Sequence, residues 1–228
     1  MTANQPAAAT RALPSVLVFW RHGRTEWNAS GRLQGQSDIE LDQTGLQQVQ
    51  QAAKVLARTF PNAAILTSDL KRAKQTTEVL AHLTGQTPIV DYRLRERSFG
   101  DWEGLQRNEI SHRWPEIFQA WQRGSDAVGK PPNGESRHEV GLRVAHTVGE
   151  YAAKLAGYQT MLVVSHGAAI TAGITALIGE DPGAWHGITG LDNANWSVLV
   201  KKPPSQNWRL VGHNLGVTPL NVGEVFGA

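Results

Sequence analysis

The sequence contains no cysteine among its 228 residues, and long apolar runs are missing as well. The lack of cysteine excludes disulfide bonds, thiolate metal sites and a cysteine nucleophile. The apolar run nearest the start, Val16 to Trp20, is too short to cross a membrane or to form the apolar part of a signal peptide. We therefore expect no membrane contact, and a cytoplasmic location is the default expectation.

An excess of charge of one sign is also absent. Lys and Arg number 22 against 20 Asp and Glu, which leaves a net charge of +2, and basic residues form no long run. A chain with this balance lacks the basic surface that nucleic-acid binding requires, so we expect no nucleic-acid partner. Hydrophobic residues make up 40% of the chain, as in ordinary globular proteins with a sizeable core.

Short apolar runs alternate with helical patterns, which predicts a three-layer α/β/α sandwich around a mostly parallel sheet. The expected parallel strands are residues 16–20, 64–67, 89–90 and 161–164. Two late runs, 196–200 and 208–211, flank the turn KKPPSQN and predict an antiparallel edge. The fold class is therefore α/β.

The composition changes along the chain predict a simple domain organisation. Residues 1–14 are small or polar and contain proline, so we expect a flexible tail there. Residues 15–228 are expected to form a single domain. Within it, residues 102–133 contain three tryptophans and Pro115, which predicts a helical insertion rather than a separate domain.

Three helix starts are predicted from capping residues. Thr44 to Gln47 fits a capping box, Ser68 is a favourable N-cap, and Ser136 to Glu139 fits a second capping box. Gly85 is expected to end the helix that follows Ser68.

Two histidines directly follow predicted strands, and each is followed by glycine. These are His22 and His166. Ligand sites in open α/β sheets form beyond the carboxyl ends of the strands, so both imidazoles are expected in one crevice. Arg21 and Arg72 are expected at the same edge, and the planar fork of arginine suits phosphate oxygens. Together with the amides of helix N-termini, these side chains predict a phosphate site.

A metal site is the alternative explanation for paired histidines. Arg21, Arg24 and Arg72 would repel a cation, and neither a His-x₃-His spacing nor a carboxylate pair accompanies the histidines. We therefore expect no metal and no other cofactor.

Spaced sequence blocks resemble those of the histidine phosphatase superfamily, which includes the phosphoglycerate mutases. The blocks occur in the family's order between about residues 16 and 178, and they are RHG at 21–23, Asn28, SDLKRA at 68–73, LRERSFGDWEG at 94–104, GES at 134–136 and VSHG at 164–167. The resemblance implies the phosphoglycerate mutase-like fold and a phosphohistidine intermediate.

The resemblance also implies a role for each catalytic candidate. His22 would be the nucleophile, and Arg21, Arg72 and His166 would clamp the phosphate oxygens. Glu96 would protonate the leaving oxygen and later deprotonate the attacking water. A nucleophilic histidine must be neutral, and neighbouring cations lower its pKa, so the flanking arginines favour the reactive form.

Other residues near these blocks complete the expected site. Asp101 and Glu103 are alternatives to Glu96 as the acid. Four residues are expected to contact the substrate: Asn28, Gln34, Arg24 and Gly167. A glycine after the histidine lets a tetrahedral group approach the backbone closely. Arg24 stands where the family commonly has Glu or Gln, and this additional cation would suit a substrate that carries a carboxylate.

The expected reaction is hydrolysis of a phosphomonoester, because the segment between Glu96 and Gly134 is shorter than the insertion of the mutases. The expected substrate is a small-molecule phosphate ester, either a sugar phosphate or a phosphoglycerate derivative such as glucosyl-3-phosphoglycerate. Mutase-type phosphoryl transfer, a non-catalytic phospho-ligand binding module and a metal-dependent hydrolase are the alternatives. The C-terminal strand pair offers an edge to a second copy, so a homodimer stays open.

Overall fold

A six-stranded sheet forms the centre of the computed structural model, which describes residues 12–201 and 207–217. Its strand order is β3-β2-β4-β1-β5-β6. The strands are β1 (Val16–Arg21), β2 (Ala64–Thr67), β3 (Ile89–Val90), β4 (Thr160–Ser165), β5 (Trp196–Val200) and β6 (Arg209–Leu215). Strands β1 to β4 pair in parallel, whereas β5 pairs antiparallel with both of its neighbours. The predicted mostly parallel sheet with an antiparallel edge is confirmed.

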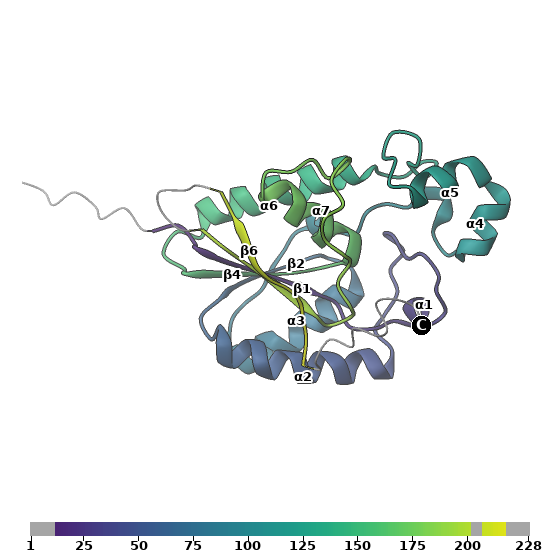
Figure 1. Cartoon of the computed structure of the whole chain (residues 1–228). Coiled ribbons are helices and arrows are strands. Elements are labelled where there is room, and N and C mark those ends of the chain that lie inside the picture. The colour runs from purple at the N-terminus through teal and green to yellow at the C-terminus, as the bar shows by residue number, and fades with distance from the viewer. Residues whose placement is uncertain (1–11, 202–206, 218–228) are drawn as a thin grey trace, which may run out of the picture.

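Helices cover both faces of this sheet (Figure 1). The four long helices are α2 (Gln43–Thr59), α3 (Lys71–Thr84), α6 (Arg137–Lys154) and α7 (Gly167–Leu177). Alternate residues of β1 enter two different cores. Leu17 and Phe19 pack with residues of α6 and α7, whereas Val18 and Trp20 pack with residues of α2 and α3. The three-layer sandwich follows from this alternation.

The predicted helical insertion contains α4 (Arg107–Arg113) and α5 (Pro115–Gln122). Two short 3₁₀ helices precede it, η1 (Tyr92–Leu94) and η2 (Gly100–Trp102). Trp102 is fully buried at its centre, with its ring 5.9 to 6.5 Å from those of Trp114, Phe118 and Trp121. This aromatic cluster explains why the segment packs as a unit.

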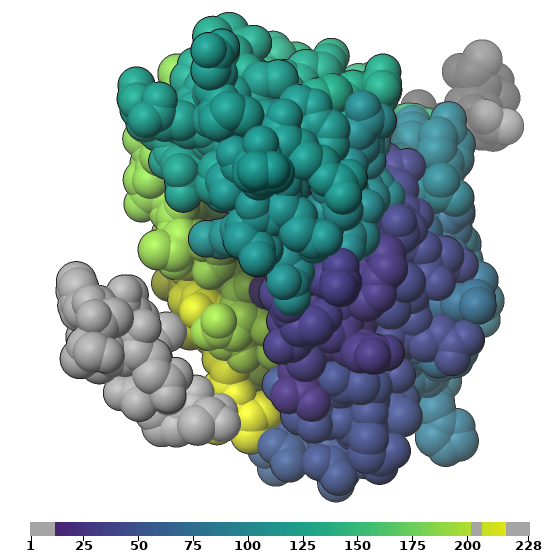
Figure 2. All heavy atoms as spheres, turned by 90° about the vertical axis from the view of Figure 1, so that its right-hand side faces the viewer, coloured from purple at the N-terminus to yellow at the C-terminus, as the bar shows by residue number. Residues whose placement is uncertain are grey.

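The insertion lies against the segment that follows β1, which includes α1 (Glu26–Ala29). Leu33 donates its backbone N–H to the carbonyl of Leu105, and Arg32 forms a β-bridge with Gln106. Figure 2 shows the insertion in teal above this purple segment, on the side of the molecule where β1 ends. The two segments together frame the carboxyl edge of the sheet.

One predicted helix start is wrong because a neighbouring carboxylate caps the helix. Asp42, rather than Thr44, is the N-cap of α2, and its side chain accepts the N–H of Gly45 at 2.7 Å. An ionised carboxylate is also favoured by the positive end of the helix. The capping box at Ser136 is confirmed, and Gly85 ends α3 with φ of 69°, as predicted.

The predicted cap at Ser68 is also wrong, because a distant loop supplies the acceptor. The N-cap of α3 is Leu70, whose side chain makes no capping bond. The first helical N–H, that of Lys71, donates instead to Oδ1 of Asp38 at 2.7 Å. Ser68 is thereby free to bind elsewhere, and its partner lies in the site described below.

Some expectations concern residues that the structure does not describe, and others stay predictions. Residues 1–11 of the expected tail and residues 202–206 of the KKPPSQN turn lie outside the described residues. The carbonyl of Ala12, also assigned to the tail, accepts the N–H of Gly157 at 2.8 Å. Within the described ranges, none of the helices combines the length and apolar character needed to cross a bilayer. The single-domain organisation stays a prediction.

Candidate active site

A hollow of about 180 Å³ lies at the carboxyl edge of the sheet. It brings together seven of the nine residues expected at the site, namely Arg21, His22, Asn28, Gln34, Arg72, Glu96 and Gly167. The two others, Arg24 and His166, do not belong to its lining.

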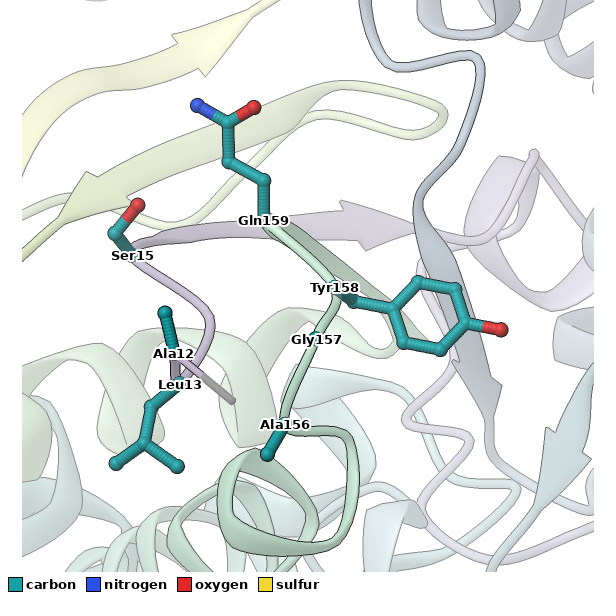
Figure 3. Close-up of a pocket in the computed structure, with 7 residues that line it drawn as sticks. All are labelled: Ala12, Leu13, Ser15, Ala156, Gly157, Tyr158 and Gln159. Carbon is teal, nitrogen blue, oxygen red and sulfur yellow. The ribbon is translucent and has the colours of Figure 1, made fainter. Parts of the chain in front are cut away.

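A second hollow, of about 510 Å³, lies at the opposite edge of the sheet. Figure 3 shows its lining, which comes from the residues just before β1 and from the loop before β4. Ser15, Tyr158 and Gln159 supply its polar side chains, and none of the described residues in its lining carries a charge. The charged and titratable side chains therefore line the smaller hollow, which is the candidate active site.

His22 follows β1 directly and is only 2% exposed. Its Nδ1 lies 2.7 Å from the carbonyl oxygen of Gly23. A carbonyl can only accept, so Nδ1 carries the proton and Nε2 keeps its lone pair. Burial, followed by the charges of Arg72 and Arg21, lowers the pKa of His22 well below 6.5. The ring is therefore neutral near pH 7, and Nε2 has no hydrogen-bond partner within residues 12–201 and 207–217.

The backbone of His22 is tied to the loop before β5. Its carbonyl accepts the N–H of Ala194 at 3.1 Å and Nδ2 of Asn193 at 3.2 Å. Asn193 Nδ2 also donates to Oδ1 of Asn28 at 3.2 Å, an oxygen that accepts the N–H of Thr25 as well. Because its oxygen is occupied in this way, Asn28 has only its amide N–H groups to offer the hollow.

Arg72 is fully buried at the start of α3. Its Nε donates to Nδ1 of His166, and its terminal nitrogens donate to the carbonyls of Ser37 at 2.8 Å and Gly35 at 2.7 Å. Each terminal nitrogen keeps one further N–H. Burial lowers the pKa of Arg72 to about 10, with Glu96 opposing, so the side chain stays charged at neutral pH.

His166 lies behind Arg72 rather than in the hollow. Its Nδ1 accepts from Arg72 at 3.1 Å, so Nε2 carries the proton and donates to Oγ of Ser68 at 2.9 Å. Burial and the charge of Arg72 lower its pKa well below 6.5, and its ring centre lies 5.1 Å from that of His22. This differs from the expected direct clamp on phosphate, because both ring nitrogens already have partners.

Two buried polar atoms of the hollow are without a partner among the described residues, Nε of Arg21 and Oε1 of Gln34. Unpaired buried groups are costly, so this donor and this acceptor fit a ligand that supplies the matching atoms. Nη1 of Arg21 donates to the carbonyl of Leu191. A Cβ at Gly167 would lie 3.3 Å from Nε of Arg21, so a larger residue there would crowd this donor.

Glu96 lies at the N-terminus of α7. Its Oε1 accepts the N–H of Ala169 at 2.8 Å, and its Oε2 accepts that of Ala168 at 3.2 Å. The amides that we expected to face a phosphate are thus used to hold a carboxylate. Glu96 is 8% exposed and belongs to the lining of the hollow.

The two alternative acids have other contacts. Glu103 accepts backbone N–H groups from Gln36, Ser37 and Phe99 at 2.9 to 3.1 Å, so it fixes the loop after α1. Asp101 is exposed and accepts from Nδ2 of Asn133. Neither belongs to the lining, which leaves Glu96 as its carboxylate.

Arg24 is held away from the hollow. Its Nε donates to Asp42 and its Nη2 to Thr44, both at 2.8 Å, at the start of α2. The carboxylate that caps α2 thus also holds this guanidinium, and a contact of Arg24 with the substrate stays a prediction. Arg32 supplies a third arginine to the lining instead.

Sequence reasoning missed both Arg32 and Asn193. Their signals are weak, since Arg32 lies in a polar loop and Asn193 in NANW near the end of the chain. Among the described residues, no group of three or more His, Asp or Glu side chains could hold a metal ion.

Comparison with known proteins agrees with this geometry. Residues 17–216 match the family model described as histidine phosphatase superfamily (branch 1), and the chain belongs to this superfamily. A glucosyl-3-phosphoglycerate phosphatase from Mycolicibacterium vanbaalenii is 38% identical over 190 residues, which are 81% of this chain and 83% of that protein. A metal-independent phosphoserine phosphatase from Arabidopsis thaliana is 33% identical over 157 residues, covering 68% of this chain and 66% of that protein.

A solved structure extends the similarity to the whole fold. The mycobacterial glucosyl-3-phosphoglycerate phosphatase in complex with VO3 superposes with a TM-score of 0.81 at 35% identity, covering 89% of this chain and 100% of that one. The expected phosphoglycerate mutase-like fold is confirmed. The expectation of a phosphomonoesterase of the histidine phosphatase superfamily is confirmed as well.

Proposed function

We propose that this chain hydrolyses a small phosphorylated metabolite of the phosphoglycerate type through a phosphohistidine formed at His22. One observation carries the proposal: Nε2 of His22 keeps a free lone pair in a hollow that it shares with Arg21 and Arg72. A neutral nucleophile and fixed cations are what metal-free phosphoryl transfer requires.

In the first step, the Nε2 lone pair forms a bond to phosphorus while the ester P–O bond breaks. The leaving oxygen takes a proton from Glu96 and departs as an alcohol. Nε of Arg21 and the remaining N–H groups of Arg72 neutralise the phosphoryl oxygens.

In the second step, Glu96 takes a proton from water, whose oxygen attacks phosphorus. The P–N bond breaks and its electron pair returns to Nε2 of His22, so inorganic phosphate leaves and the enzyme is restored. His166 acts through Arg72, because the hydrogen bond from Nε of Arg72 to His166 fixes the plane of the guanidinium. Asn28 offers its amide N–H groups to the same anion.

The substrate type is supported by the relatives and by the size of the site. The relatives are named for glucosyl-3-phosphoglycerate and for phosphoserine, and both compounds carry a carboxylate near the phosphate. A hollow of about 180 Å³ is smaller than a typical site of roughly 300 Å³ or more for a drug-sized ligand. It accommodates a phosphoryl group and a short carbon chain, while a larger group projects from the mouth.

Hydrolysis of p-nitrophenyl phosphate with and without EDTA tests the proposal, with His22→Ala as the variant. His146→Ala, an exposed histidine of α6, is the matched control. We expect activity that survives chelation, disappears in His22→Ala and persists in His146→Ala. A ³²P-labelled substrate would identify the phosphohistidine. The wild-type protein should retain a label that is labile in acid and stable in base, and His22→Ala should retain none.

Other outcomes select the alternatives. Loss of activity in EDTA would indicate a metal-dependent hydrolase, and binding of phosphate without turnover would indicate a binding module. Interconversion of phosphoglycerates without release of phosphate would indicate a mutase. A cytoplasmic location and a homodimer stay predictions.

A further inference from the structure

The hollow contains one arginine more than the phosphoryl group requires. Arg72 is fully buried, and Arg21 is partly buried. Arg32 belongs to the same lining, and its side chain is 38% exposed, so it reaches solvent as well as the hollow. A cation in this place is suited to a part of the substrate other than the phosphate.

The guanidinium of Arg32 is anchored at one nitrogen. Nη1 donates to the carbonyl of Gly104 at 2.6 Å, and Glu109 lies 3.5 Å from the same nitrogen, at the limit of a hydrogen bond. The backbone is fixed as well, since the N–H of Arg32 donates to the carbonyl of Trp27 at 2.9 Å. The position of the charge is therefore set before a ligand arrives.

The opposite side of this guanidinium is free. Nε and Nη2 of Arg32 have no partner among the described residues, and their N–H groups point in the same direction. This pair of donors matches the two oxygens of a carboxylate. The chain itself provides an example: Nε and Nη2 of Arg95 bind both oxygens of Asp69 at 2.8 and 2.6 Å.

The charges of the lining also favour a substrate with an anionic group besides the phosphate. Three arginines and one glutamate line the hollow. When Glu96 is protonated to act as the acid, three positive charges face the substrate. A phosphomonoester dianion balances those of Arg21 and Arg72. Glu109 lies 3.5 Å from Nη1 of Arg32, so a substrate carboxylate on the opposite side of the guanidinium would share this cation with Glu109.

We propose that Arg32 is the specificity-determining residue that binds a substrate carboxylate through Nε and Nη2. The enzyme thereby selects phosphomonoesters whose alcohol part carries a carboxylate. This inference rests on the proposed function and adds to it the recognition of the leaving group.

The test compares two substrates that differ only in this group, 3-phosphoglycerate and glycerol 3-phosphate. The quantity measured is the ratio of their kcat/KM values. A hydrogen-bonded ion pair contributes about 1.5–3 kcal/mol, so we expect Arg32→Met to lower this ratio by about tenfold or more, mainly through KM. Arg32→Lys keeps the charge without the fork and is expected to give an intermediate ratio.

Arg107→Met is the matched control, because Arg107 lies on α4 of the neighbouring insertion, is exposed and packs over Trp121. It should leave the ratio unchanged, and thermal unfolding should show that both Met variants are folded. A ratio in Arg32→Met within threefold of the wild type, or an equal loss on both substrates, would overturn the inference.

Calorimetric binding of the same two compounds separates the inference from the proposed function. If the wild type released phosphate from neither compound, the proposed function would fail. The binding preference for 3-phosphoglycerate, and its loss in Arg32→Met, would still support the role of Arg32. Equal affinities of the wild type for both compounds would overturn that role.

Discussion

Nδ1 of His22 donates its proton to the carbonyl oxygen of Gly23, the next residue in the chain, at 2.7 Å. The acceptor that fixes the tautomer of this ring is thus the carbonyl of the adjacent residue. The orientation of Nε2 depends on the local backbone and not on a distant side chain. The burial that lowers the pKa of His22 then has a measurable consequence for stability.

We predict that the free energy of unfolding decreases as the pH falls below 6.5. The pKa values of His22 and His166 are lowered well below this value in the folded chain, so the unfolded chain binds protons that the folded chain does not. Each histidine then removes roughly 1 kcal/mol per pH unit until its folded pKa is reached. Urea unfolding between pH 7 and 5.5 measures this slope.

Replacement of one buried histidine isolates its contribution. His166→Gln should show a shallower dependence on pH than the wild type, whereas His146→Gln, at an exposed position, should not. Equal slopes in all three proteins would contradict the prediction.

We predict that Glu96→Gln discriminates between leaving groups. Loss of a general acid lowers rates by about 10²–10⁴, and kcat/KM for glycerol 3-phosphate should fall within this range. For p-nitrophenyl phosphate, whose leaving group needs little protonation, kcat/KM should fall much less. Asp101→Asn, the exposed alternative acid, should change neither value. A selective loss in Asp101→Asn instead would reassign the acid.

We predict that Asn193→Asp weakens both catalysis and the binding of orthovanadate. The variant keeps the shape of the side chain but loses the donor that binds the carbonyl of His22 and Oδ1 of Asn28. Two hydrogen bonds of about 0.5–1.5 kcal/mol each correspond to a loss of about tenfold in kcat/KM. Asn108→Asp, on the exposed side of α4, is the control. Unchanged affinity for vanadate would argue against this positioning role.

We predict opposite effects on stability for two glycines in helices. A Cβ at Gly45 of α2 would overlap the carbonyl oxygen of Arg24 and lie 2.7 Å from its nitrogen, so Gly45→Ala should destabilise the fold by about 1–3 kcal/mol. A Cβ at Gly149 of α6 meets nothing within 4 Å, so Gly149→Ala should stabilise it by about 1 kcal/mol. Denaturant unfolding distinguishes them, and equal shifts would contradict the prediction.

Local signals account for what the sequence predicted well. The apolar run before His22 and the one before His166 predict two strands, and their order in the sheet places both rings at one edge. The capping box at Ser136 needs only residues three positions apart, and it formed as predicted. These features depend on neighbours in sequence or on strand direction.

Features that depend on distant partners were not predictable. Nothing in the sequence around Lys71 indicates that Asp38 caps α3. Asp38 nevertheless accepts the N–H of Lys71 from 33 positions away. Asn193 reaches His22 across 171 positions. Arg24 donates to Asp42, the N-cap of α2, and does not line the hollow. In each case the partner is brought close only by the three-dimensional arrangement, so the sequence around either residue does not indicate the contact.

The order of the strands also bears on how the protein is synthesised. The strand that precedes His22 is paired with β4 and β5, and both come from the last third of the chain. During translation, β1 emerges first but has no neighbour until the ribosome has passed residue 160. A strand with two open edges is a template for aggregation, so nascent chains of this protein should depend on chaperones until β4 is released.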